Sequence, residues 1–195
     1  MYRTFAFIFV SIAIAACRKT GVSSAADHKD KIDACSLLTK QEIQEIDGAP
    51  AKDTKSSENS NAGLRVAQCF YTVDPFSKSV SLAITQADSS SAKPRSAKQV
   101  WEETFGRFEG EAKEEKGDEE KKESLHKGEE EEEANPPKKI EGIGDAAYWT
   151  ANRVGGALYV LKGDVSIRIS VGGPDKEEAK IEKSKSLARK ALDRL

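Results

Sequence analysis

The sequence has few of the side chains that carry most enzyme and metal chemistry. Its 195 residues include two histidines, three cysteines and one methionine, with no Cys-x-x-Cys pair. His28 and His126 lie in polar segments, where a general base or zinc ligand would lack the fixed geometry it needs. The Gly-x-Ser-x-Gly, His-Glu-x-x-His and phosphate-loop patterns do not occur. We therefore expect a protein that is not an enzyme and has no metal site and no cofactor.

Net charge is also scarce, because 31 basic residues nearly balance 33 acidic ones. Without a strong positive field, nucleic acid is not an expected partner. The charges are concentrated in Glu109–Lys139, where 20 of 31 positions are charged and Glu129–Glu133 is an unbroken acidic run. Leu125 is the only sizeable apolar side chain there, so this stretch cannot bury enough surface to fold by itself. We call residues 109–139 the charged insert and predict a solvated, low-complexity segment.

The chain has no long hydrophobic run. The apolar stretch Phe5–Ala16 has 12 residues, whereas a helix that crosses a bilayer needs roughly 20. Its position after Arg3 and before small residues predicts a signal peptide over residues 1–16. The run ends in Ile-Ala-Ala-Cys17, which resembles the lipobox of bacterial lipoproteins and implies that Cys17 is lipidated after cleavage. The alternative is an ordinary signal peptide followed by a chance cysteine.

Residues 17–31 are predicted to form the lipidated cysteine and a flexible polar tether. Several acyl chains on Cys17 would anchor the protein stably in a membrane of the cell envelope. The resemblance to lipoproteins also bears on location, because an Asp after the lipidated cysteine commonly signals retention in the inner membrane. Arg18 stands there instead. The expected location is therefore the outer membrane, facing the periplasm, if the cell is Gram-negative.

The two other cysteines, Cys35 and Cys69, are predicted to form a disulfide, because exported proteins fold in an oxidising compartment. The alternative is a pair of free thiols with a redox or metal-binding role. Neither cysteine has a histidine nearby in a ligand pattern, which favours the structural disulfide.

Three helices are expected. The first begins at Thr39, where Glu42 completes a capping box, and ends before Gly48. The second is an amphipathic helix over residues 96–108, whose Trp and Phe side chains are expected in the core. The third begins after Asp175. Its expected features are a cap formed by Asp175 with Glu178 and an inner stripe of Ile181, Ser184, Ala188, Ala191 and Leu195, with Leu187 and Leu192 beside it.

The remaining folded segments have the composition or alternation of strands. They are Leu64–Val73, Ser79–Thr85, Ala146–Ala151, Ala157–Leu161 and Val165–Val171. Residues 52–63 are rich in Ser, Asn and Lys and are predicted to be a loop with at most a short edge strand, and residues 154–156 are predicted to be a turn. Hairpins flanked by helices predict an α+β fold over residues 32–195, with one twisted antiparallel sheet covered by helices.

The segment Gly142–Ala147 matches the Gly-x-Gly-x-x-Ala pattern of dinucleotide-binding proteins. That function requires a strand before the glycines and a helix after them. Here two prolines precede the segment and a strand follows it, so we predict a tight turn in which Asp145 bonds the loop. Tyr148 and Trp149 follow directly. We expect them to pack in the core, but Asp145, Tyr148 and Trp149 remain candidates for lining a ligand pocket.

Three motifs occur in a fixed order: Cys35-Ser-Leu-Leu-Thr39, Cys69-Phe-Tyr71 and Gly142-Ile-Gly-Asp-Ala-Ala-Tyr148. In this order they resemble a family of bacterial lipoproteins that is described only as a domain of unknown function, with some members in actinobacterial envelopes. The resemblance covers roughly residues 35–105 and 140–195 and leaves out the charged insert. It implies paired cysteines and a sheet with helices similar to PsbP-like folds, and it brings no catalytic residues.

Three functions are consistent with these features. The first is a non-catalytic envelope lipoprotein that binds a protein partner or a small ligand through its folded domain, and this is the one we favour. The second is an enzyme whose site has no recognisable pattern. The third is an ion or polycation interaction through the charged insert, although the EF-hand calcium pattern is missing.

Overall fold

The computed structural model describes residues 31–111, 136–152 and 155–195. Cys17, the predicted signal peptide and residues 112–135 of the charged insert lie outside these ranges, as do both histidines. Within the described residues, none of the helices combines the length and the apolar character needed to span a bilayer.

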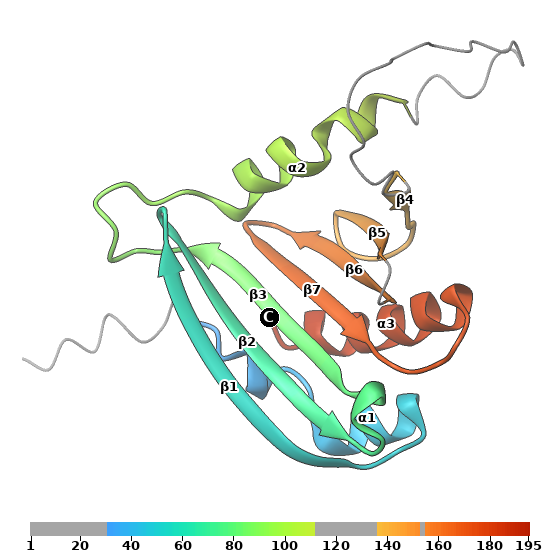
Figure 1. Ribbon diagram of the computed structural model, residues 1–195. Helices are drawn as coiled ribbons and strands as arrows, with labels where there is room; N and C mark the ends of the chain where they lie inside the picture. The colour runs from blue at the N-terminus through green and yellow to red at the C-terminus, as the bar shows by residue number, and fades with distance from the viewer. Residues whose placement is uncertain (1–30, 112–135, 153–154) are drawn as a thin grey trace, which may run out of the picture. The chain divides into compact units, whose positions relative to one another are not determined.

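Seven strands form one antiparallel sheet in the order β1-β2-β3-β7-β6-β5-β4 (Figure 1). All neighbouring strands are antiparallel. The strands are β1 (Ala51–Asn61), β2 (Leu64–Val73), β3 (Val80–Ala87), β4 (Lys138–Lys139), β5 (Ala146–Asn152), β6 (Gly155–Lys162) and β7 (Val165–Val171). This confirms the predicted α+β class and the single antiparallel sheet.

The pairing of β3 with β7 joins the two halves of the chain. Val80 lies opposite Val171, and Leu82 lies opposite Ile169. These apolar side chains are at most 2% exposed, and they form the centre of the main core together with the neighbouring pair Ile84 and Ile167. The two strands with the clearest alternation of apolar and polar residues, β3 and β7, therefore lie at the middle of the sheet, where each has a strand on both sides.

Helices cover both faces of the sheet. One face carries η1 (Ala34–Ser36), α1 (Lys40–Asp47) and α3 (Glu177–Leu192), which enclose the main core. On the opposite face, α2 (Ala97–Glu111) packs a smaller cluster of Trp101 and Phe105 against Tyr148 and Leu161. No helix lies in front of β1 and β2 in Figure 1, which leaves that part of the second face uncovered in this view. A further short helix, η2 (Phe76–Lys78), connects β2 to β3.

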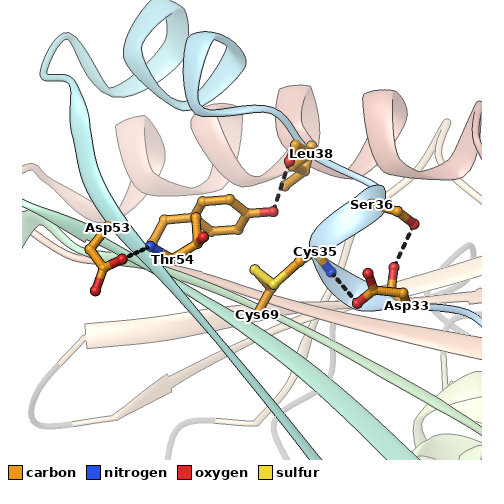
Figure 2. The surroundings of a disulfide bond; sticks show 8 residues. Asp33, Cys35, Ser36, Leu38, Asp53, Thr54 and Cys69 are labelled. Carbon is orange, nitrogen blue, oxygen red and sulfur yellow. Dashed lines mark hydrogen bonds between the residues drawn. A yellow bond between two sulfur atoms is a disulfide. The ribbon is translucent and has the colours of Figure 1, made fainter.

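The predicted disulfide between Cys35 and Cys69 is present and ties η1 to β2 (Figure 2). The Asp33 carboxylate accepts a hydrogen bond of 3.0 Å from the backbone N–H of Cys35 and so caps η1. The buried hydroxyl of Tyr71 donates to the carbonyl oxygen of Leu38 at 2.9 Å, and its burial raises the pKa of Tyr71 to about 12. The chain that leads into α1 is thus fastened to the sheet both covalently and by a buried hydrogen bond.

The capping box predicted at Thr39 is confirmed, and its carboxylate has a second role. Thr39 accepts from the backbone N–H of Glu42, and Glu42 accepts from that of Thr39. The guanidinium of Arg194, after the end of α3, donates to both carboxylate oxygens of Glu42, at 2.8 and 3.0 Å. These Arg194 bonds, helped by the Thr39 N–H, lower the pKa of Glu42 from 4.5 to about 2, although burial opposes the shift.

The prediction of a loop over residues 52–63 is wrong, because β1 runs through almost all of it. After Ala51 the residues of β1 are polar and almost all exposed, as expected of an edge strand. The sequence therefore shows no alternation of apolar residues there. The register from Asn61 opposite Leu64 to Ala51 opposite Val73 is fixed by backbone bonds and by a two-residue turn. That turn places Ala62 at φ 49° and Gly63 at φ 80°, the left-handed conformation that tight hairpins require.

Three details of the last strands and helix also differ from expectation. The residue at the N-cap of α3 is Lys176, and no side chain caps it. Asp175 instead accepts a 2.6 Å bond from Lys183, which also bridges to Asp47 of α1. Leu195 is 44% exposed and lies outside the buried stripe. Gly155 and Gly156 belong to β6 rather than to a turn, because they pair with Asn152 and Ala151 of β5. The absence of a side chain at Gly156 leaves room for the Trp149 ring.

Replacing both Cys35 and Cys69 by Ala should lower the free energy of unfolding by roughly 3–4 kcal/mol, because the bridge closes a loop with a sequence separation of 34 residues. Urea unfolding at pH 7 measures the loss. Dithiothreitol should destabilise the wild-type chain by a similar amount and leave the double variant unchanged. Equal stability of the oxidised wild type and the variant would contradict this role.

Glu42→Gln should destabilise the domain by about 3 kcal/mol at pH 7, from the shift of the Glu42 pKa to about 2. A lowered pKa stabilises the folded state fully above the unfolded value of 4.5, and this contribution is lost as the pH falls towards 2. Urea unfolding from pH 7 to pH 2 should therefore show the two proteins converging. Glu45→Gln, on the exposed side of the same helix, is the matched control. A difference independent of pH would contradict the prediction.

Candidate functional site

A hollow of about 650 Å³ opens between the end of α2, the segment that joins β4 to β5, and the start of β5. We call it the Tyr148 hollow. It is lined by Glu109, Lys139, Ile140, Glu141, Gly142, Ile143, Gly144, Asp145, Ala146, Ala147 and Tyr148. Its volume lies in the range of sites for small molecules.

Glycine shapes the floor of the hollow. Gly142 and Gly144 have φ values of 76° and 62°, so both adopt the left-handed conformation that favours glycine. A Cβ atom on Gly144 would lie 2.4 Å from Cγ1 of Val160 and 2.5 Å from the carbonyl oxygen of Leu161. The backbone N–H of Asp145 donates to that same Leu161 oxygen at 2.7 Å. The loop is therefore pressed directly against β6, which the Gly-x-Gly spacing makes possible.

Asp145 fixes this loop to the neighbouring β6–β7 turn. Its carboxylate accepts a 2.6 Å bond from the backbone N–H of Gly163 and a 3.2 Å bond from Nζ of Lys162. The Gly163 bond, followed by the Lys162 bond, lowers the pKa of Asp145. Asp145 thus forms hydrogen bonds as predicted, and its partners lie at the turn between β6 and β7. Both carboxylate oxygens already have partners, so Asp145 positions the loop.

Tyr148 lies in the α2-side cluster and is only 1% exposed. Its ring stacks on Phe105 with 5.0 Å between ring centroids and 6° between planes, and Trp101 lies 5.9 Å away. Its buried hydroxyl makes no hydrogen bond to any other described residue. Burial raises the pKa of this hydroxyl, and the negative charge of Glu109 raises it further. Tyr148, a residue of the lining, therefore carries a buried, neutral hydroxyl that has no hydrogen-bond partner among the described residues.

Glu109 reaches the hollow from the last part of α2. The indole Nε1–H of Trp101 donates to Oε1 of Glu109 at 3.2 Å, which orients the carboxylate although the residue is exposed. Sequence reasoning assigned Glu109 to the charged insert and so missed it. α2 in fact continues to Glu111 and β4 begins at Lys138, so both ends of the predicted insert belong to structured elements. Glu109 lies eight residues after Trp101, beyond the spacings of three and four that pair side chains on a helix, so no local pattern identified it.

Two of the three residues proposed as ligand-binding candidates line the hollow, and the third does not. Asp145 and Tyr148 are in its wall. Trp149 instead lies in the main core on the other face of the sheet, 2% exposed, beside Gly156. Neighbouring residues of a strand point to opposite faces, so Tyr148 and Trp149 could not both line one hollow.

Two other hollows lie near the β1–β2 hairpin. One, of about 850 Å³, includes Lys93, Arg95 and Glu103, and the other, of about 670 Å³, includes Ser57 and Gln68. Among the described residues, the buried side-chain polar atoms without a hydrogen-bond partner are Oδ2 of Asp47, the hydroxyl of Tyr148, Nε1 of Trp149 and the hydroxyl of Ser184. Only Tyr148 lines one of these three hollows. The Tyr148 hollow is therefore the best candidate site.

Within the described part of the chain, the side chains of His, Cys, Asp and Glu do not form a group of three that could hold a metal ion. Comparison of the chain with protein-family models, curated proteins and solved structures found no match. The function must therefore be argued from the site itself.

Gly144→Ala should destabilise the domain by roughly 3 kcal/mol, because it adds both left-handed strain and a clash with the β6 backbone. Gly142→Ala is the matched control. It has a similar φ and no atom within 4 Å of the added Cβ, so it should cost only about 1 kcal/mol. Thermal or urea unfolding of both variants measures the difference. Equal losses would show that contact of the loop with β6 contributes little.

Proposed function

We propose that this protein is a lipid-anchored protein of the bacterial cell envelope, and that its folded domain is a non-catalytic module that binds a small ligand in the Tyr148 hollow. The observation that carries the binding role is that Tyr148 belongs to the lining of a hollow of suitable size, and that its buried hydroxyl has no hydrogen-bond partner among the described residues. A buried polar group without a partner is costly, and a ligand that bonds to it offsets that cost.

The remaining groups in the hollow support binding rather than catalysis. Asp145 is committed to Gly163 and Lys162, and the pKa of Tyr148 is raised, so neither is suited to act as a base near neutral pH. The lining contains no Ser, Cys, Thr or His side chain that could act as a nucleophile or shuttle a proton. What it offers is a wall of backbone and apolar atoms with a few polar groups, as in binding pockets.

The anchor is supported by the sequence. Ile14-Ala-Ala-Cys17 ends an apolar run of the length found in signal peptides, and a polar stretch of sequence follows Cys17. The order of the Cys-x-Leu-Leu-Thr, Cys-x-Tyr and Gly-x-Gly-Asp motifs supports a relationship to the envelope lipoproteins of unknown function. Together these features favour an envelope binding module over a free enzyme.

The anchor is tested by expressing the full chain in a bacterial host and separating membrane from soluble fractions. Wild type should be found in membranes and be released by detergent, and Cys17→Ser should abolish incorporation of labelled fatty acid. The Cys35→Ala, Cys69→Ala double variant is the control and should still be lipidated. Fatty-acid labelling that survives Cys17→Ser would overturn the proposed anchor.

Ligand binding is tested by incubating the full chain carrying Cys17→Ser with small-molecule extracts of bacterial envelopes, followed by native mass spectrometry. We expect a reproducible bound mass that is lost or strongly reduced in Tyr148→Phe, which removes only the hydroxyl. Tyr159→Phe is the matched control, because its hydroxyl accepts from Arg168 and does not line the hollow. A bound mass that persists in Tyr148→Phe, or no bound mass at all, would contradict the proposal.

A further inference from the structure

The charged groups around the Tyr148 hollow favour a positively charged occupant. Its wall contains three carboxylates, from Glu109, Glu141 and Asp145, and one ammonium, from Lys139. Asp145 is neutralised by Lys162 at 3.2 Å. The remaining groups leave an excess of negative charge at the hollow, and a ligand with an ammonium group would balance it.

Glu109 has hydrogen-bonding capacity to spare. Within the described residues its one hydrogen bond comes from Trp101 and uses Oε1. A carboxylate offers about four acceptor positions, so Oε2 can receive a charge-assisted bond from a ligand while Trp101 holds the group in place. The indole thus orients the carboxylate without saturating it.

The hydroxyl of Tyr148 complements this carboxylate. A phenol oxygen accepts hydrogen bonds as well as donating one, and a primary ammonium has three N–H donors. Both residues line the hollow, and the charge of Glu109 contributes, after burial, to the raised pKa of the Tyr148 hydroxyl. The two residues reach the lining of the hollow from α2 and from β5, and a primary ammonium has enough N–H donors to bond both.

An inorganic cation fits the hollow less well. Calcium and magnesium need several oxygen ligands converging at about 2.0–2.6 Å. Within residues 31–111, 136–152 and 155–195 the acidic side chains form no such group. Ile140, Ile143 and Ala146 are apolar residues of the lining, which suits the hydrocarbon part of an organic cation better than a hydrated ion.

We propose that the Tyr148 hollow binds a small organic molecule that carries a primary ammonium group on an apolar chain, with Glu109 and Tyr148 receiving the ammonium. This inference rests on the proposed small-ligand function and specifies the chemistry of the ligand. It gives Glu109 the role of charge recognition and Tyr148 the role of a second, neutral acceptor.

The two tryptophans of the chain provide a direct test. In a nitrogen-15 spectrum of the full chain carrying Cys17→Ser, the indole N–H of Trp101 reports on Glu109, whereas that of Trp149 reports on the opposite face. Trp101→Phe assigns the two signals. The probes are hexylammonium, hexanol and hexanoate, which share one chain and differ in charge. Hexylammonium should shift the Trp101 signal saturably and leave Trp149 unmoved.

Hexanol and hexanoate should bind at least ~10-fold more weakly, since neither can donate a charge-assisted hydrogen bond to Glu109. Glu109→Gln and Tyr148→Phe should each weaken hexylammonium by ~10-fold or more. Glu102→Gln is the matched control, because it removes the same charge from α2 outside the hollow and should leave binding unchanged.

The outcomes separate this inference from the proposed function. Saturable binding of hexanol or hexanoate instead of hexylammonium would overturn the ammonium assignment and leave a small-ligand function standing. Equal binding of all three probes, or normal hexylammonium binding by Glu109→Gln, would also overturn it. If no probe moves the Trp101 signal, the ammonium assignment fails, and the envelope-extract experiment with Tyr148→Phe decides the proposed function independently.

Discussion

The antiparallel pairing of β3 with β7 is the interaction on which the rest of the domain depends. It joins a three-stranded unit from the first half of the chain to a four-stranded unit from the second half. The paired side chains, such as Leu82 opposite Ile169, are fully buried on the face that α3 and α1 cover. Without the pairing of β3 with β7, each unit would expose an unpaired strand edge and part of the main core, because neither unit could bury its apolar face alone.

The pairing of β3 with β7 also explains why charged hydrogen bonds connect the helices on the face of the main core. Glu42 at the start of α1 bonds Arg194 beyond the end of α3, and Lys183 of α3 bonds Asp47 of α1. These contacts link helices from opposite ends of the chain that meet only because the sheet is continuous. The disulfide between Cys35 and Cys69 fixes the entry to the same layer, so the helices can hardly shift without breaking a partly buried charge pair.

The Tyr148 hollow arises on the other face, between the end of α2 and the start of β5. The glycines before β5 let the chain approach β6, Asp145 locks it to the β6–β7 turn, and α2 brings Glu109 from the other side. Two of these features were predictable, since Gly-x-Gly indicates a tight turn and Asp145 a loop bond. Glu109 was not, because a glutamate at the edge of a charged run has no local signal that separates it from its neighbours.

The sequence by itself determined the class of the fold, the strong strands, the capping box at Thr39 and the cysteine pair, because each depends on periodicity, local hydrogen bonding or composition. Tertiary structure alone decided the strand order and the edge strand β1. It also decided that Asp175 bonds Lys183 instead of capping α3, and that Tyr148 and Trp149 lie in different clusters. These outcomes depend on contacts between distant segments. Polar edge residues and paired charges satisfy such contacts through backbone bonds and geometry, neither of which leaves a periodic pattern in the chain.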